Sequence, residues 1–97
     1  MNEHPLVTKY RNFSPNSAAF SARAAQVFPG GDTRASAHYK PYPLAIERAT
    51  GSRLYDIDGH ELIDFMNNFT SLIHGHAHPE VVAAIQHQAP LGSAYAA

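Results

Sequence analysis

The sequence contains no cysteine and no tryptophan among its 97 residues. Without cysteine, disulfide bonds, thiolate catalysis and thiolate zinc sites are all excluded. Concentrated positive charge is also missing, because seven Lys and Arg residues are scattered against eight Asp and Glu, for a net charge of −1. Nucleic acids and anionic membranes both attract basic clusters, so we expect neither as a partner. No apolar run approaches the roughly 18 residues of a membrane span, and no signal peptide is apparent. The composition predicts a cytoplasmic globular protein of one domain at most.

Two helices are expected. Residues 1–14 are polar and predict a flexible N-terminal arm, followed by an ordered part over 15–97. Ser14 is a suitable N-cap and Pro15 a suitable first helical residue, so we expect a helix over 15–28 that stops at Pro29-Gly30-Gly31.

The middle of the chain predicts a small sheet. Residues 44–65 form three short alternating runs, separated by Thr50-Gly51 and Asp58-Gly59. Turn dipeptides between alternating runs indicate a three-stranded antiparallel meander. The second helix should begin at Pro79 and end before Pro90. The fold class expected is therefore an α+β segment of two helices and one meander. The chain then stops at residues 91–97 without a closing element, which suggests truncation.

A histidine cluster is the first candidate site. His74, His76 and His78 would point to one side of an extended segment, where three imidazoles could bind a metal ion. No acidic residue follows closely to orient the rings, as metal-bound histidines usually require. The alternative is that the histidines pack around a tight glycine turn and cap the second helix.

Other candidates come from acids and from one arginine. Four acids lie near the meander turns, where a structural role is favoured over paired acid–base catalysis; they are Asp56, Asp58, Glu61 and Asp64. Arg34 lies on a long irregular loop after Gly30-Gly31, where its guanidinium could grip a carboxylate with two hydrogen bonds or simply face solvent.

Five motifs then follow one another along the chain. They are Phe28-Pro29-Gly30-Gly31, Pro43-Leu44-Ala45-Ile46-Glu47-Arg48-Ala49, Leu54-Tyr55-Asp56-Ile57-Asp58-Gly59, Ile63-Asp64-Phe65 and the run from His74-Gly75-His76-Ala77-His78-Pro79 to Ile85. In this order they resemble the N-terminal region of class III aminotransferases, the pyridoxal-phosphate enzymes of fold type I. Within that class the sequence is most similar to glutamate-1-semialdehyde aminomutases and β-amino-acid (β-phenylalanine) transaminases.

The resemblance implies a role for several residues. Residues 15–97 would be the N-terminal part of the minor domain of an α/β fold, in a homodimer that uses pyridoxal 5'-phosphate. Arg34 matches a loop arginine that binds a substrate carboxylate, and Phe69 and Thr70 match a segment that lines the substrate pocket. The substrates implied are amino or β-amino acids with keto acids. The histidine run matches a structural turn, so a metal is not expected.

The resemblance also implies what this chain lacks. Fold type I enzymes bind the cofactor through a Schiff-base lysine, whereas the two lysines here, Lys9 and Lys40, lie in no matching motif. The 97 residues are therefore expected to contain no catalytic residue and to be inactive alone. Two alternatives stay open: a non-catalytic remnant or interaction fragment, and a small His-rich metal-binding protein.

Overall fold

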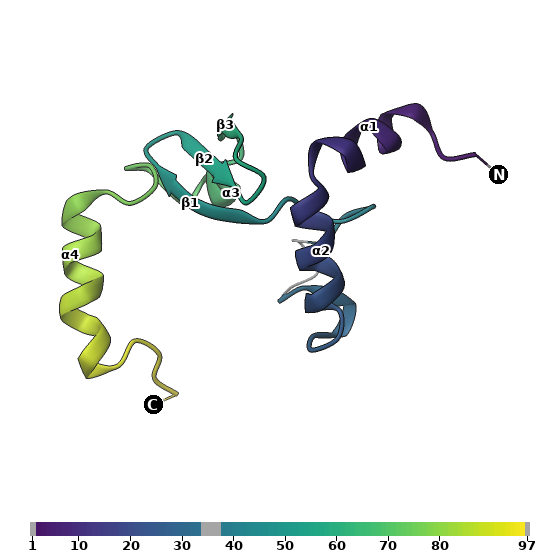
Figure 1. Ribbon diagram of the computed structural model, residues 1–97. Helices are drawn as coiled ribbons and strands as arrows, with labels where there is room; N and C mark the ends of the chain where they lie inside the picture. The colour runs from purple at the N-terminus through teal and green to yellow at the C-terminus, as the bar shows by residue number, and fades with distance from the viewer. Residues whose placement is uncertain (1, 34–37, 97) are drawn as a thin grey trace.

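A three-stranded antiparallel sheet lies at the centre of the computed structural model, which describes residues 2–33 and 38–96 (Figure 1). The strands are β1 (Ile46–Thr50), β2 (Arg53–Asp56) and β3 (Glu61–Ile63), in the order β1-β2-β3. Thr50 pairs with Arg53 across the first turn, and Tyr55 pairs with Glu61 across the second. The meander predicted from the two turn dipeptides is thus confirmed.

Both predicted helices are present. They are α2 (Pro15–Ala24) and α4 (Pro79–Gln88), and each begins with a proline whose fixed φ suits the first helical position. The first is shorter than expected: after Ala24 the chain turns and enters a 3-10 turn, η1 (Pro29–Gly31). A second 3-10 turn, η3 (Ala89–Leu91), follows α4.

The expectation of a flexible arm over residues 1–14 is corrected by the structure, because this segment contains a helix, α1 (Pro5–Phe13). His4 is its N-cap, and Nδ1 of the imidazole accepts a hydrogen bond from the Leu6 N–H at 3.2 Å. Pro5 therefore starts a helix here. Helix α1 also contacts α2 and is fixed to the rest of the chain, since the Tyr10 hydroxyl donates to the carbonyl of Tyr42 at 2.8 Å.

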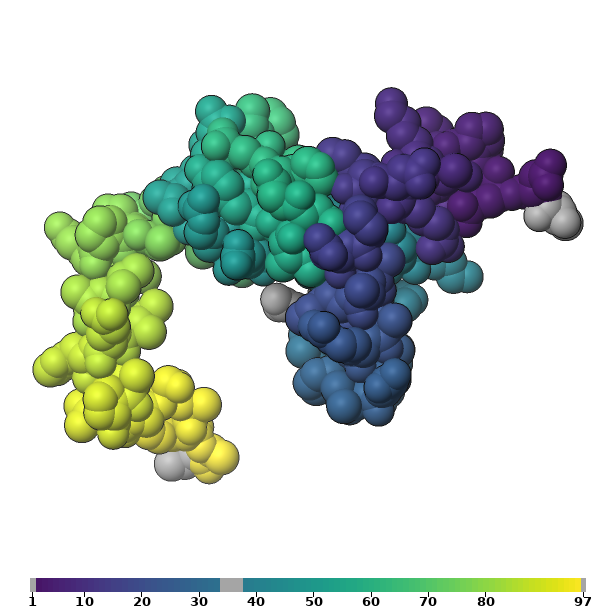
Figure 2. Space-filling model, in the orientation of Figure 1, coloured from purple at the N-terminus to yellow at the C-terminus, as the bar shows by residue number. Residues whose placement is uncertain are grey.

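The described residues bury very few large apolar side chains. Tyr42 is buried, at 5% exposure, whereas Phe65 is 93% exposed and Ile85 of α4 is 62% exposed. The molecule is correspondingly open: α4 stands away from α2 on the far side of the sheet, as Figure 2 also shows. Its radius of gyration is 16.3 Å, against about 13 Å for a compact domain of this length.

Within the described part of the chain, none of the helices combines the length and the apolar character that crossing a bilayer requires.

Candidate functional site

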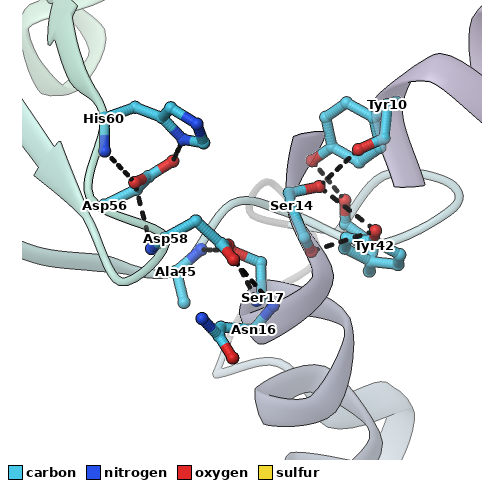
Figure 3. Close-up of polar contacts among 9 residues, drawn as sticks. All are labelled: Tyr10, Ser14, Asn16, Ser17, Tyr42, Ala45, Asp56, Asp58 and His60. Atoms are coloured by element: carbon cyan, nitrogen blue, oxygen red, sulfur yellow. Dashed lines mark hydrogen bonds and ion pairs between the residues drawn. The ribbon is translucent and has the colours of Figure 1, made fainter. Parts of the chain in front are cut away.

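The first polar cluster joins helix α2 to the sheet (Figure 3). The carboxylate of Asp58, on the β2–β3 turn, accepts hydrogen bonds from the N–H of Asn16 at 2.8 Å and from the N–H and hydroxyl of Ser17, both at 3.1 Å. The Ser17 hydroxyl in turn accepts from the Ala45 N–H at 3.0 Å. Asp58 therefore caps the first turn of α2, where a negative charge is favoured by the helix dipole. Ser14 occupies the N-cap position as predicted, but its side chain makes no capping bond.

Two further residues, Asp56 and Tyr42, make hydrogen bonds beside this joint. Asp56 is buried, and its carboxylate accepts from the N–H groups of Asp58 and His60 and contacts His60 Nδ1 at 2.8 Å. The Tyr42 hydroxyl bonds to the Ser14 carbonyl at 3.2 Å. Burial is the main reason that the pKa of Tyr10 is raised to about 12. The carboxylates of Asp56 and Asp58 are thus engaged by hydrogen bonds within the chain, and the structural role that the sequence favours for them stays a prediction.

Asp58→Ala is expected to destabilise this joint. Desolvation acts to raise the pKa of Asp58, but the hydrogen bonds from Asn16 and Ser17 outweigh it, so the pKa is lowered in the folded state. The contribution of Asp58 is then present while the carboxylate is ionised in both states, and is lost as the pH falls through its folded-state pKa. Thermal unfolding of the complete natural polypeptide, followed from neutral to acid pH, should show a lower midpoint for the variant and a smaller acid dependence.

Glu61→Ala is the matched control for this prediction. Glu61 is an exposed carboxylate on the same sheet, paired with Arg53 at 3.2 Å. Exposed pairs contribute little, so its removal should leave the unfolding midpoint nearly unchanged. Equal effects of the two substitutions would contradict a capping role for Asp58.

The second cluster closes the loop of residues 64–76, which we call the clasped loop. An isolated antiparallel bridge joins Gly51 to His76, with both backbone hydrogen bonds at 2.9 Å. The two backbones approach so closely that a Cβ on Gly75 would lie 3.0 Å from the Gly51 carbonyl oxygen. The Asp64 N–H also donates to the Ser52 carbonyl at 2.8 Å. Both ends of the clasped loop are thus fixed to the β1–β2 turn.

The middle of the clasped loop is a left-handed turn, labelled α3 (Asn67–Thr70) in Figure 1. Its four residues have φ values of 53°, 47°, 56° and 67°. Asparagine adopts this region with several-fold preference, whereas a β-branched residue such as Thr70 does so rarely. The sequence motifs did not predict this turn, although Asn67-Asn68 is a signal for it.

Asp64 lies between the turn and the histidines. Its Oδ1 accepts from the N–H groups of Met66 and Asn67, both at 2.9 Å, and its Oδ2 lies 2.5 Å from His76 Nε2. The hydrogen bond from Asn67, followed by that from His76, lowers the pKa of Asp64. The acid that contacts a histidine therefore lies before the cluster, twelve residues ahead of His76 in the sequence, whereas the sequence pattern directed attention to the residues after it.

The sequence-predicted residues are distributed as follows. Phe69 and Thr70 are both exposed on the left-handed turn, while Arg34 lies outside the described residues. The three histidines do not converge: the rings of His74 and His78 are tilted by 46° with centroids 5.1 Å apart, and His76 contacts Asp64 instead. Across residues 2–33 and 38–96, no group of three or more possible ligands could hold a metal ion.

Comparison with known proteins identifies the class. The family model described as aminotransferase class-III matches residues 34–95, which is more than half of the chain. The chain therefore belongs to the class III aminotransferase family, as the order of its motifs predicted. The fold class predicted from that resemblance, an α+β segment of a pyridoxal-phosphate-dependent transaminase, is confirmed by the likeness to solved transaminases.

Individual relatives agree with this assignment. A glutamate-1-semialdehyde 2,1-aminomutase of Methanopyrus kandleri is 50% identical over 76 residues, covering 78% of this chain and 18% of the relative. A solved transaminase with PLP bound is 46% identical, with a TM-score of 0.75 over 87% of this chain and 20% of its own. A β-phenylalanine aminotransferase from Variovorax paradoxus is 31% identical, with a TM-score of 0.80 over 89% and 20%. The chain thus spans about a fifth of the relatives it matches.

Proposed function

We propose that these residues form the N-terminal segment of a pyridoxal-phosphate-dependent aminotransferase that transfers an amino group between an amino or β-amino acid and a keto acid. The observation that carries the proposal is the family match over residues 34–95, joined by the likeness to a transaminase with PLP bound. A cytoplasmic homodimer is part of the same proposal, since it follows from the family resemblance.

The cofactor itself would be held elsewhere. Fold type I chemistry needs a lysine that binds the cofactor and an acid against the cofactor ring. The cofactor, when bound, would withdraw electrons from the substrate. Lys9 and Lys40 are both exposed, and both lie outside any motif that matches the cofactor lysine. The described residues therefore do not fit the cofactor by themselves, and no catalytic step is assigned to them.

The role proposed for this segment is substrate recognition. Arg34 would bind the substrate carboxylate, as the family resemblance implies. Phe69 and Thr70 would line the substrate pocket, and their exposure on the left-handed turn supports this role.

A non-catalytic remnant or interaction fragment is the second candidate. It agrees with the scarcity of buried apolar side chains in the described residues, because such a surface associates with other proteins. A piece of a complete aminotransferase would show the same surface, so the size of the natural polypeptide decides between the two candidates.

The intact mass of the protein from its native source separates them. For an aminotransferase we expect a mass several times the 10.6 kDa of these residues. We also expect a visible absorbance band from the cofactor that borohydride bleaches. A mass equal to 97 residues, with no such band, would overturn the proposal and favour the remnant.

A further inference from the structure

We propose that Asp64 and His76 are positioning residues that determine substrate selectivity by holding Phe69 and Thr70 on the left-handed turn. This inference rests on the proposed function, since it requires that the turn lines a substrate pocket. It adds two residues that touch no substrate and act through the backbone of the clasped loop.

The backbone of the left-handed turn is strained. Four consecutive residues with positive φ, two of them Phe69 and Thr70, form a conformation that the chain does not adopt by itself. Such conformations persist where surrounding structure holds them, and they gather at ligand-binding sites. Contacts outside the turn must therefore keep it left-handed.

Asp64 supplies those contacts. One carboxylate oxygen accepts from Met66 and Asn67, the residues at the start of the turn, at 2.9 Å each. The Asp64 side chain is only 7% exposed, and its hydrogen bond to Asn67 is part-buried. The Asp64 backbone N–H donates to the Ser52 carbonyl on the β1–β2 turn, so the left-handed turn is anchored to the sheet.

His76 fixes the remaining freedom of Asp64. The second carboxylate oxygen faces His76 Nε2 at 2.5 Å, and charge-assisted hydrogen bonds are the strong ones. His76 is itself held by the two backbone hydrogen bonds to Gly51. The start of the turn, the carboxylate and the β1–β2 turn thus form one connected unit, which holds the backbone that carries Phe69.

Loss of Asp64 would release the turn. The backbone would relax toward right-handed conformations, and Phe69 and Thr70 would move relative to a bound substrate. A misplacement of about 1 Å can lower the rate of an enzyme about a hundredfold. We expect a smaller effect here, an increase of about tenfold in the KM of a bulky substrate. The cofactor is held by other residues, so kcat and cofactor absorbance should change less than about twofold.

The experiment compares Asp64→Ala and His76→Gln with the wild type in the complete natural polypeptide loaded with pyridoxal phosphate. We would measure kcat and KM for alanine and for β-phenylalanine, as a small and a bulky amino donor. The expected result is an increased KM for the bulky donor and a changed ratio of kcat/KM between the donors. If Asp64→Ala does not fold, as judged by lost cofactor absorbance, His76→Gln decides the outcome alone.

One further variant separates positioning from general stability. His60→Gln removes a matched Asp–His contact, that of Asp56 at 2.8 Å on the same sheet, and should leave selectivity unchanged.

Unchanged selectivity in the foldable Asp64 or His76 variants, or an equal change in His60→Gln, would overturn the inference. Failure of the proposed function is seen separately, as a wild-type polypeptide without cofactor or transamination.

Discussion

Arg34→Ala is expected to raise the KM for carboxylate substrates about a hundredfold in the complete enzyme. Truncating one partner of a buried charge pair costs about 2–5 kcal/mol, and each 1.4 kcal/mol is tenfold in affinity. Cofactor absorbance should stay intact, because the arginine is proposed to bind substrate and not cofactor. Steady-state kinetics with an amino acid and with the matching amine, which lacks the carboxylate, measure the effect directly.

Two variants sharpen that test. Arg34→Lys keeps the charge but loses the planar pair of donors, so it should recover only part of the affinity. Arg53→Ala removes an exposed arginine that pairs with Glu61 on the sheet, and it should change neither KM nor kcat. An unchanged KM for the carboxylate substrate in Arg34→Ala would exclude the proposed role.

Gly75→Ala is expected to be the most destabilising small substitution in the clasped loop. The residue has φ +76°, and an added Cβ would lie 3.0 to 3.2 Å from three backbone atoms of Gly51. Backbone atoms in a hydrogen-bonded bridge cannot move aside, so overpacking adds to the strain of positive φ. We expect a loss of about 2–4 kcal/mol in the free energy of unfolding, measured by denaturant titration.

Gly59→Ala is the control for Gly75→Ala. Gly59 also has positive φ, at +88°, but an added Cβ would meet nothing within 4 Å. Its cost should be that of the backbone conformation alone, about 1 kcal/mol. Equal losses at the two positions would show that the close approach at Gly51 does not matter.

Local signals in the sequence predicted much of this fold. Proline at the first helical position located α2 and α4, and Thr50-Gly51 and Asp58-Gly59 located the two turns of the meander. These features depend on neighbours within a few residues, so they can be predicted from the sequence without knowledge of the tertiary structure. The order of the same motifs identified the family.

Contacts between distant residues could not be predicted in this way. Asp58 was interpreted as a turn residue only, because its bonds to Asn16 and Ser17 join positions more than 40 apart in the sequence. The contact between Asp64 and His76 could not be predicted either, because twelve residues separate them in the sequence. Helix α1 was missed because its polar composition resembles that of a flexible arm.

The openness of the molecule has a thermodynamic consequence. Side chains such as Val82 and Ile85 of α4 are exposed here, so covering them with another body would add to the stability of this segment. The measured stability would then be a linked equilibrium, in which folding and association are parts of one reaction. If the covering body is a separate chain, the melting temperature rises with its concentration; if it is part of the same chain, the melting temperature is independent of concentration.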